Sequence, residues 1–350
     1  MNKILLTGGS GFIGSHTCLL LLEKGFQVVI LDSCVNSSSK SVESILKFLK
    51  SFESFNFHKP EFIKGDINDE SLLIEIFSKA IKDGNPISGV IHFAGLKSVK
   101  ESITNPIKYW QNNVSGTINL INVMNIFNCN TIIFSSSATI YGLNNTELVK
   151  EDTVISPTNP YGSTKATIEN LLRDLFESEK EKWSIINLRY FNPIGAHPSG
   201  FIGESPSSSP NNIFPLIMNA ALFRKEVFQI YGNDWDTYDG TCIRDYIHVM
   251  DLAEAHVKAL EFILQNRYRC LSLNIGTGKG TSVLQLINIF QEVNNVEIKY
   301  VFTNRREGDA PNVVANNEMA LKFLKWTPRR NISDMCRDGW KWKKLNPSGY

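Results

Sequence analysis

The stretch that decides the fold is Thr7-Gly8-Gly9-Ser10-Gly11-Phe12-Ile13-Gly14, near the start of the chain. An apolar run at residues 3–7 leads into it, and residues 12–24 have the spacing of a helix. The glycines match both GxGxxG (9, 11, 14) and GxxGxxG (8, 11, 14), which allows a tight turn whose backbone closely approaches a ligand. The N-terminus of a helix there offers free amides and a positive dipole end to phosphates. The motif therefore predicts a phosphate-binding turn between a strand and a helix.

An acidic residue follows the next predicted strand, residues 27–31. Asp32 lies 32 − 14 = 18 residues after Gly14, close to the spacing of about 20 expected for a ribose-binding carboxylate. A carboxylate accepts hydrogen bonds from the adenosine ribose and repels a 2′-phosphate, so the expected cofactor is NAD rather than NADP. The alternative is a glycine turn with a solvated aspartate. Asp66, which follows Gly65, either holds the adenine amino group or caps a helix.

Strands and helices alternate along the first half of the chain. Apolar strands are expected at 3–7, 27–31, 61–64, 89–93 and 131–135, with helices at 12–24, 41–55, 71–82 and 107–127. This order predicts an α/β fold, a Rossmann-type doubly wound parallel sheet. Proline and glycine recur after residue 190, and helices are expected again at 213–223, 251–264 and 283–293. We predict an NAD-binding domain at 1–190 and a smaller α/β substrate-binding lobe at 191–350, with some elements crossing between them and the ligand in between.

Composition excludes several classes of protein. The chain has 350 residues, and 36 basic minus 35 acidic residues leave a net charge of +1, so neither nucleic acid nor an anionic membrane is expected as partner. No apolar run approaches the roughly 18 residues of a membrane span, and no export signal is recognisable, so we expect a cytoplasmic protein. The six cysteines form no CxxC pair, which argues against a zinc site and a disulfide framework. No metal is expected, since His248, Asp251 and His256 have poor spacing for a metal site.

Tyr161 and Lys165 lie four residues apart in Pro160-Tyr161-Gly162-Ser163-Thr164-Lys165. If Pro160 opens a helix, the two side chains share one face. A nearby ammonium and a positive nicotinamide ring are expected to lower the tyrosine pKa from its ordinary value of about 10, which suits a general base. Ser137, at the end of the preceding strand, can hydrogen-bond the reacting hydroxyl. The alternatives are that Tyr161 and Lys165 lie on an exposed face of a helix, and that the serines around Ser137 form a turn at the end of a strand.

In this order, the motifs resemble those of the extended short-chain dehydrogenases/reductases, and most closely the UDP-glucose 4-epimerase family. The resemblance extends from Ile4 to about Tyr350. Its longest matching stretches are residues 7–18, 92–97, 134–139, 189–193, 195–200, 239–241, 244–252 and 305–309.

The resemblance implies two sets of binding residues and a catalytic group of Tyr161, Lys165 and Ser137. The implied cofactor residues are Gly8, Gly11, Phe12, Ile13, Asp32, Asn36, Ser37, Asp66, Ile67, Phe93, Ala94, Lys97, Asn112, Tyr161, Lys165 and Phe191. The implied UDP-sugar residues are Ser137, Ala138, Thr139, Asn192, Asn212, Ile213, Gln229, Ile230, Tyr231, Arg244, Tyr246, Val283, Arg306, Asp309 and Val313.

The resemblance also implies an activity. UDP-glucose and UDP-galactose are expected to interconvert in galactose metabolism through reversible hydride transfer at sugar C4 and a 4-keto intermediate. NAD would stay tightly bound and be recycled, and the enzyme would be a homodimer. In the family, a bulky Tyr at the position of Val313 accompanies use of UDP-hexoses only, so valine predicts activity on UDP-GlcNAc and UDP-GalNAc as well.

Two other functions stay open at this point. A nucleotide-sugar dehydratase or decarboxylase of the same superfamily needs a carboxylate beside Ser137, where this chain has Ala138 and Thr139. A non-enzymatic NAD-sensing protein would be expected to lack Tyr161 or Lys165, and both are present.

Overall fold

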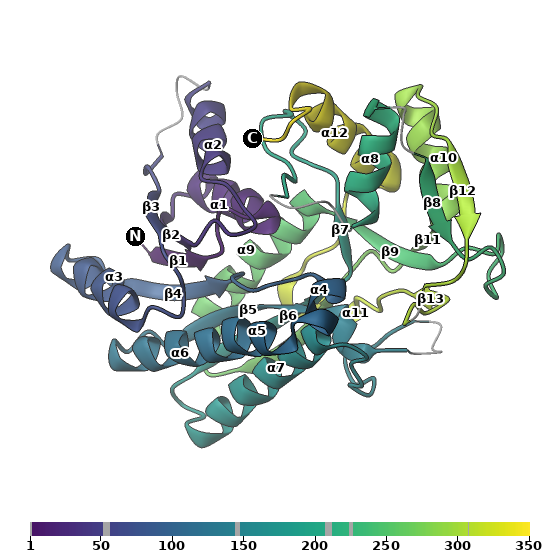
Figure 1. Ribbon diagram of the computed structural model, residues 1–350. Helices are drawn as coiled ribbons and strands as arrows, with labels where there is room; N and C mark the ends of the chain where they lie inside the picture. Colours follow the sequence, from purple (N-terminus) through teal and green to yellow (C-terminus); the bar gives the residue numbers. More distant parts are fainter. Residues whose placement is uncertain (1, 52–56, 144–147, 207–211, 224–226, 307) are drawn as a thin grey trace.

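A parallel sheet of seven strands forms the centre of the protein (Figure 1). The computed structural model describes residues 2–51, 57–143, 148–206, 212–223, 227–306 and 308–350. In sheet order the strands are β10 (Cys270–Ile275), β6 (Ser184–Tyr190), β5 (Thr131–Ser137), β4 (Ile87–His92), β1 (Lys3–Thr7), β2 (Gln27–Asp32) and β3 (Glu61–Lys64). The order reverses between β1 and β4, and at such a switch point doubly wound sheets bind ligands beyond their carboxyl ends. The predicted fold class is confirmed.

Helices cover both faces of the sheet, which explains why the strands read as continuous apolar runs. One core contains side chains of the helices on one face, α1 (Phe12–Glu23), α2 (Lys40–Lys50), α9 (Val249–Gln265) and α11 (Glu318–Leu324). The opposite core contains side chains of α3 (Glu70–Lys82), α6 (Gly116–Ile126) and α7 (Pro160–Ser178). Figure 1 shows α3, α6 and α7 below the sheet.

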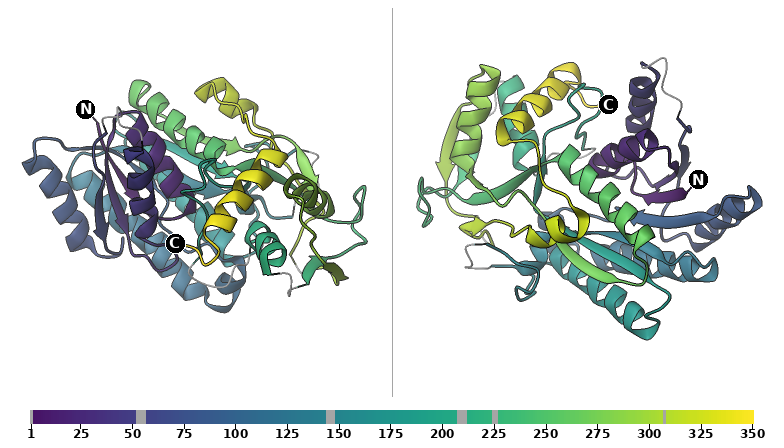
Figure 2. Two further views of the ribbon diagram at one scale, coloured as in Figure 1. Left: turned by 90° about the horizontal axis from the view of Figure 1, so that it is seen from above. Right: turned by 180° about the vertical axis from the view of Figure 1, so that it is seen from behind.

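A smaller lobe lies beside the carboxyl ends of the central strands (Figure 2). It combines a four-stranded sheet of β7 (Asn192–Ile194), β9 (Ile243–His248), β11 (Gly280–Ser282) and β13 (Asn312–Val313) with a pair of strands, β8 (Phe228–Tyr231) and β12 (Tyr300–Thr303). Its core packs against α8 (Ile213–Phe223), α10 (Val283–Asn294) and α12 (Ile332–Leu345). Three elements that follow residue 190, β10, α9 and α11, belong to the central sheet and its cover.

The predicted helix at 107–127 contains a local change of helix type. The chain runs from α4 (Val99–Thr104) through α5 (Pro106–Tyr109) into a π-helical segment, η1 (Trp110–Ser115), and then α6. A π-helical turn is wider than an α-turn and is frequent at functional sites. It places Asn113 within hydrogen-bond distance of Leu96, in the loop after β4, and the periodicity of the sequence does not predict it.

The predicted helix at 41–55 ends at residue 50, and residues 52–56 lie outside the described part. Within the described ranges no helix is both long and apolar enough to cross a membrane. The same ranges contain no group of three or more metal-ligating His, Cys, Asp or Glu side chains. His248 instead caps α9 by accepting a hydrogen bond from the amide of Met250 at 3.0 Å.

Candidate active site

The glycine turn after β1 forms a cradle that only glycine permits. Gly8 has φ +70°, and a Cβ atom there would lie 2.6 Å from the backbone nitrogen of Ala94 on the neighbouring strand end. A Cβ at Gly14 would lie 2.6 Å from the carbonyl oxygen of Gly8. Gly11 is the N-cap of α1, and no side chain caps the helix amides. These open amides and the close backbone packing fit the diphosphate of a dinucleotide.

Asp32 holds the loop beside this cradle. Its buried carboxylate accepts hydrogen bonds from the amides of Ser10 and Cys34, each at 2.9 Å, and from the Ser37 hydroxyl at 2.7 Å. Asp32 is therefore a structural anchor as well as the predicted ribose acceptor.

Asp66 is not the cap of the following helix. The side chain of Asp69 caps α3, accepting from the amide of Leu72, whereas Asp66 accepts from the amide and side chain of Asn68. The helix-capping alternative for Asp66 was therefore wrong, because the cap is Asp69, three residues later.

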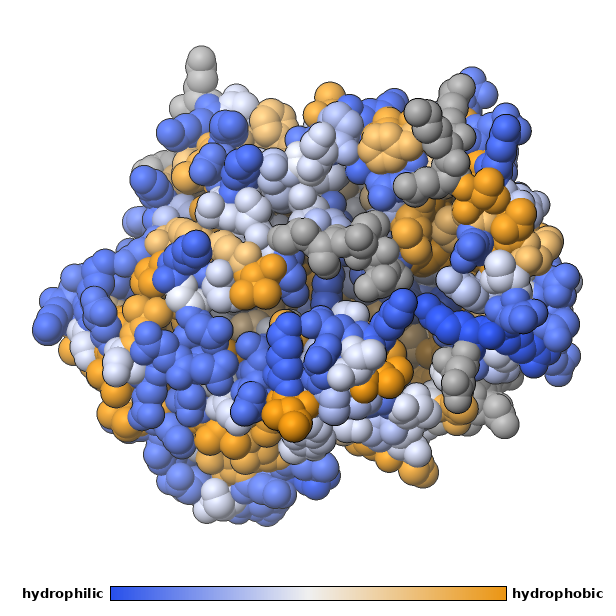
Figure 3. Space-filling model, in the orientation of Figure 1, coloured by the Kyte–Doolittle hydropathy of each residue, from blue (hydrophilic) through white to orange (hydrophobic). Residues whose placement is uncertain are grey.

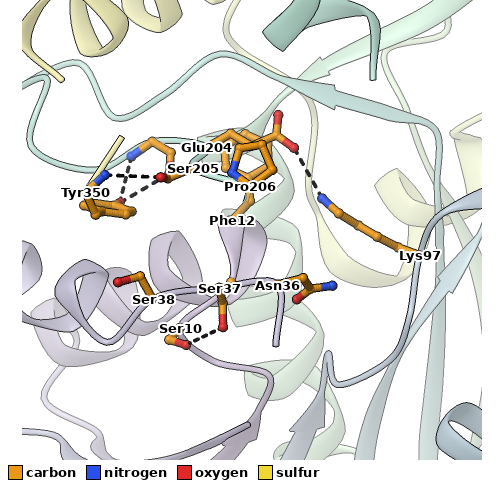
Figure 4. Close-up of a pocket in the computed structure, with 12 residues that line it drawn as sticks. Ser10, Phe12, Asn36, Ser37, Ser38, Lys97, Glu204, Ser205, Pro206 and Tyr350 are labelled. Atoms are coloured by element: carbon orange, nitrogen blue, oxygen red, sulfur yellow. Dashed lines mark hydrogen bonds and ion pairs between the residues drawn. The ribbon is translucent and has the colours of Figure 1, made fainter. Parts of the chain in front are cut away.

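A pocket adjoins the cradle and brings both parts of the chain together (Figure 4). Ser10 and residues 36–38 lie on one side, and residues 204–206 with Tyr350 lie on the other (Figure 4). The ammonium of Lys97 lies 3.3 Å from the buried carboxylate of Glu204. The same carboxylate oxygen accepts a hydrogen bond from the side-chain amide of Asn212 at 3.4 Å. Glu204, which sequence reasoning missed, thus joins a predicted cofactor residue to a predicted UDP-sugar residue.

Ser137, at the end of β5, lies near enough to Tyr161 of α7 to influence its pKa. The Ser137 oxygen accepts from the Thr139 hydroxyl at 3.0 Å and from the Thr139 amide at 3.2 Å. A serine hydroxyl has one proton to donate, and its interaction with the Tyr161 phenol lowers the pKa of that phenol, against the effect of burial. Thr139 therefore orients Ser137, and Ser137 contacts the predicted base.

Lys165 lies on the same helix as Tyr161 but contacts other groups. Its buried ammonium donates to the Ser135 carbonyl at 2.8 Å and lies 6.0 Å from the centre of the Tyr161 ring. Burial lowers the pKa of Lys165 to about 8, and Glu169 partly offsets this effect. Burial also raises the pKa of Tyr161, with the Ser137 hydrogen bond acting in the opposite direction. The protein alone therefore does not lower the tyrosine pKa as expected, because desolvation outweighs the other effects.

A buried ion pair fixes the helix that carries both residues. Glu169, one turn beyond Lys165, pairs with Arg189 of β6 at 2.6 Å, and both side chains are almost fully buried. Glu169 also accepts from Ser136, and Arg189 donates to the Tyr141 hydroxyl at 2.9 Å. These bonds connect α7 to β5 and β6. Only the four-residue spacing from Lys165 hinted at Glu169 in the sequence.

Asn113, in η1, anchors a second side of the site. Its amide donates to the Leu96 carbonyl and to the Thr164 hydroxyl, both at 3.1 Å, and its oxygen accepts from the Leu96 amide at 2.8 Å. Asn113 thereby connects the loop after β4 to α7. The neighbouring Asn112, a predicted cofactor residue, is half-buried.

Charged UDP-sugar candidates gather in the second lobe. Asp309 lies 2.8 Å from the guanidinium of Arg306 and 3.4 Å from that of Arg244. The Arg306 guanidinium lies over the Tyr231 ring, 5.7 Å from its centre. Two guanidinium groups side by side suit a diphosphate. Ile230 and Tyr246, in contrast, are buried in the core of the lobe, so their side chains do not join this charged group.

Val313 of β13 lies near residues of both predicted sets. Val313 and Ala138 pack against one apolar cluster that contains Phe191, a predicted cofactor residue. Val313 pairs with Arg244 in the sheet, so its position is connected to the charged group as well.

The remaining predicted residues have diverse surroundings. Phe93 packs on His256 with ring centres 4.7 Å apart, and Ile67 is buried against the backbone of Gly116. Phe12, Ile13, Ala94, Asn192, Ile213 and Val283 are half-buried, and Asn36, Asn212 and Gln229 are exposed.

Known proteins resemble this chain over nearly its full length. A family model for GDP-mannose 4,6 dehydratase matches residues 5–339. The UDP-glucose 4-epimerase of Yersinia enterocolitica is 47% identical over 349 residues, which cover 99% of each protein. A crystal structure of UDP-glucose-4-epimerase from Stenotrophomonas maltophila with bound NAD and formylated UDP-arabinopyranose has a TM-score of 0.93 at 40% identity, covering 99% of both chains.

A more distant structure, the UDP-Glc/GlcNAc 4-epimerase of Campylobacter jejuni, has a TM-score of 0.82 at 30% identity and covers 99% of this chain and 100% of that chain. The dehydratase model and the epimerases share the extended short-chain fold, and the full-length identities are to epimerases. The resemblance seen in the sequence is thus confirmed, and the chain belongs to the UDP-glucose 4-epimerase family of the extended short-chain dehydrogenases/reductases.

Proposed function

We propose that this chain is an isomerase that interconverts UDP-glucose and UDP-galactose, with NAD as its cofactor. The family supports this activity, and the observation that carries it is the placement of Ser137, at the end of β5, near Tyr161 of α7, whose pKa it lowers against the effect of burial. Ser137 lies on β5, the strand next to β4, whose end lines the glycine cradle. Tyr161 lies on α7, which is joined to β5 by the hydrogen bond from Lys165 to the Ser135 carbonyl. A proton acceptor and a dinucleotide site therefore adjoin the same edge of the sheet.

The residues of the cradle fit NAD. The amides that begin α1 would hold the diphosphate, Asp32 the adenosine ribose, and Lys165 the nicotinamide ribose hydroxyls. When bound, NAD supplies a reversible acceptor for the hydride of sugar C4.

Tyr161 would take the proton of the sugar 4-hydroxyl. Ser137 contacts the phenol oxygen and would also reach the sugar hydroxyl, so that it supports the proton transfer. The protonated Tyr161 returns its proton when the 4-keto group is reduced on its other face. Arg244 and Arg306 would hold the diphosphate while the hexose turns.

The dehydratase alternative is not favoured. Chemistry at other sugar carbons needs a further acid or base beside Ser137, and the next two residues are Ala138 and Thr139. Glu169 is a buried carboxylate of α7, the helix that carries Tyr161. It is already bound by Arg189 and Ser136.

We also propose that the site accepts N-acetylated sugars. Val313 packs against the cluster that contains Phe191, as Ala138 does, and its side chain is smaller than a tyrosine ring. The UDP-Glc/GlcNAc 4-epimerase name of the Campylobacter relative is consistent with such a range within the family.

Proton NMR of UDP-galactose and of UDP-GalNAc, each incubated with the purified protein without added cofactor, tests both proposals. We expect both to convert to their gluco partners. No conversion of either sugar, even with NAD supplied, would refute the epimerase. Val313→Tyr should remove UDP-GalNAc conversion only, while Val301→Tyr, at an exposed position of β12, should change neither. Equal loss of both activities in Val313→Tyr would refute the steric argument.

We further propose a cytoplasmic homodimer. Exposed apolar side chains follow one another from α4 to α6: Ile103, Ile107, Trp110, Ile118 and Ile126. Figure 3 shows hydrophobic atoms over the lower helices of this view. Light scattering on a size-exclusion column should give twice the chain mass, and a monomer at all concentrations would refute the dimer.

A further inference from the structure

A short segment of the second half, Gly203–Pro206, lies across the pocket that adjoins the glycine cradle. It faces Ser10 and Ser37 across the pocket, and Phe12 lies beside Pro206 (Figure 4). Gly203 and Glu204 are buried, and Glu204 pairs with Lys97. A dinucleotide diphosphate held by the α1 amides would therefore lie beneath this segment.

Tyr350 fastens the segment. Its hydroxyl accepts a hydrogen bond from the Gly203 amide at 3.0 Å and donates to the Gly203 carbonyl at 3.2 Å, while its own amide donates to the Ser205 hydroxyl at 3.2 Å. Burial raises the pKa of Tyr350 to about 12, so the hydroxyl keeps the proton that it donates. The ring packs edge-on against Trp342 of α12, with centres 5.5 Å apart.

Tyr350 also connects to the opposite wall of the pocket. Its backbone oxygen accepts from the Lys40 ammonium at 3.3 Å. Lys40 begins α2, directly after residues 36–38 of the pocket wall. Tyr350 thus connects both walls of the pocket. We call Gly203–Pro206 together with Tyr350 the clasp.

Gly203 shows how closely the clasp is fitted. A Cβ at this position would lie 2.4 Å from the Trp342 ring. Close packing on Trp342 therefore restricts a shift of the segment toward α12, and the hydrogen bonds to Tyr350 and the Glu204–Lys97 ion pair hold it at the pocket.

We propose that Tyr350 is a positioning residue of the cofactor site: it holds Gly203–Pro206 over the bound dinucleotide and so slows the release of NAD. The inference rests on the proposed function in that NAD occupies this pocket. Release then requires the clasp to open, whereas proton transfer at Tyr161 proceeds with the clasp closed.

The test measures NAD release directly. Wild-type protein, Tyr350→Phe and Tyr350→Ala are loaded with radiolabelled NAD and chased with excess unlabelled NAD. Tyr350→Phe keeps the ring on Trp342 and loses both hydroxyl hydrogen bonds, so release should be roughly tenfold faster. Tyr350→Ala should release NAD faster still. Tyr300→Phe, which alters an exposed tyrosine of β12, is the matched control and should release NAD like the wild type.

An unchanged release rate in Tyr350→Phe, with a native circular dichroism spectrum, would overturn the proposal. Equal acceleration in the Tyr300→Phe control would overturn it too. Because Tyr350→Phe preserves the packing, it decides the question even if Tyr350→Ala does not fold. Epimerase activity is measured separately: faster NAD release from a protein that epimerises no sugar would support the clasp and refute only the proposed activity.

Discussion

The contact between the glycine turn and the end of β4 predicts a large effect for one added methyl group. Gly8→Ala places a Cβ atom 2.6 Å from the Ala94 nitrogen, 2.8 Å from its Cα and 2.9 Å from the Phe93 carbonyl carbon. All three are backbone atoms, so no rotation of a side chain relieves the contact. The strand ends must separate, and the phosphate cradle between them changes shape.

A second glycine separates the cost of conformation from the cost of contact. Gly25 has φ +81°, similar to the +70° of Gly8, but a Cβ there meets nothing within 4 Å. Gly25→Ala should thus lose only the roughly 1–2 kcal/mol of a left-handed alanine. Gly8→Ala adds an overpacking cost of about 1–3 kcal/mol, for a total of about 2–5 kcal/mol.

Urea denaturation of both variants gives the difference in the free energy of unfolding, and calorimetry gives the affinity for NAD. We expect Gly8→Ala to be less stable than Gly25→Ala and to bind NAD at least about tenfold more weakly. Gly25→Ala should keep wild-type affinity. Equal destabilisation of the two variants, or unchanged NAD affinity in Gly8→Ala, would refute the argument that close backbone packing forms the cradle.

Three further variants test other contacts. Thr139→Val removes the hydroxyl that orients Ser137 and should lower kcat by about 5- to 30-fold, whereas Thr139→Ser should restore it; equal kcat in all three proteins would contradict this role. Burial lowers the pKa of Lys165 to about 8 from 10.5, so between these pH values the unfolded chain binds a proton that the folded chain lacks, and stability rises with pH. Lys165→Met should lose that rise in urea denaturation; an unchanged pH dependence would argue against it. Arg244→Lys loses the guanidinium bonds that reach toward Asp309, so KM for UDP-galactose should rise by about tenfold with little change in kcat; a fall in kcat alone would contradict a binding role.

Short sequence patterns were sufficient to predict several of the strands and helices. The strand at 3–7, the glycine turn and the helix from residue 12 appear where the sequence predicted them, because glycine spacing and apolar runs act over a few residues. The helix at 213–223 also has its predicted bounds. The π-helical segment at 110–115 was not predicted, since its wider turn depends on the packing of Asn113 against Leu96 and Thr164.

The sequence by itself determined the fold class, the glycine turn between β1 and α1, and the placement of Tyr161 and Lys165 on one helix, since each depends on residues close together in the chain. Only the tertiary structure brought Glu204 between Lys97 and Asn212, and Tyr350 onto Gly203, across separations of 107, 8 and 147 residues. The tertiary structure also decided the direction of the shift in the pKa of Tyr161, which burial raises, because a sequence does not show which side chains are desolvated. Long-range contacts and desolvation arise only when the two parts of the chain pack together.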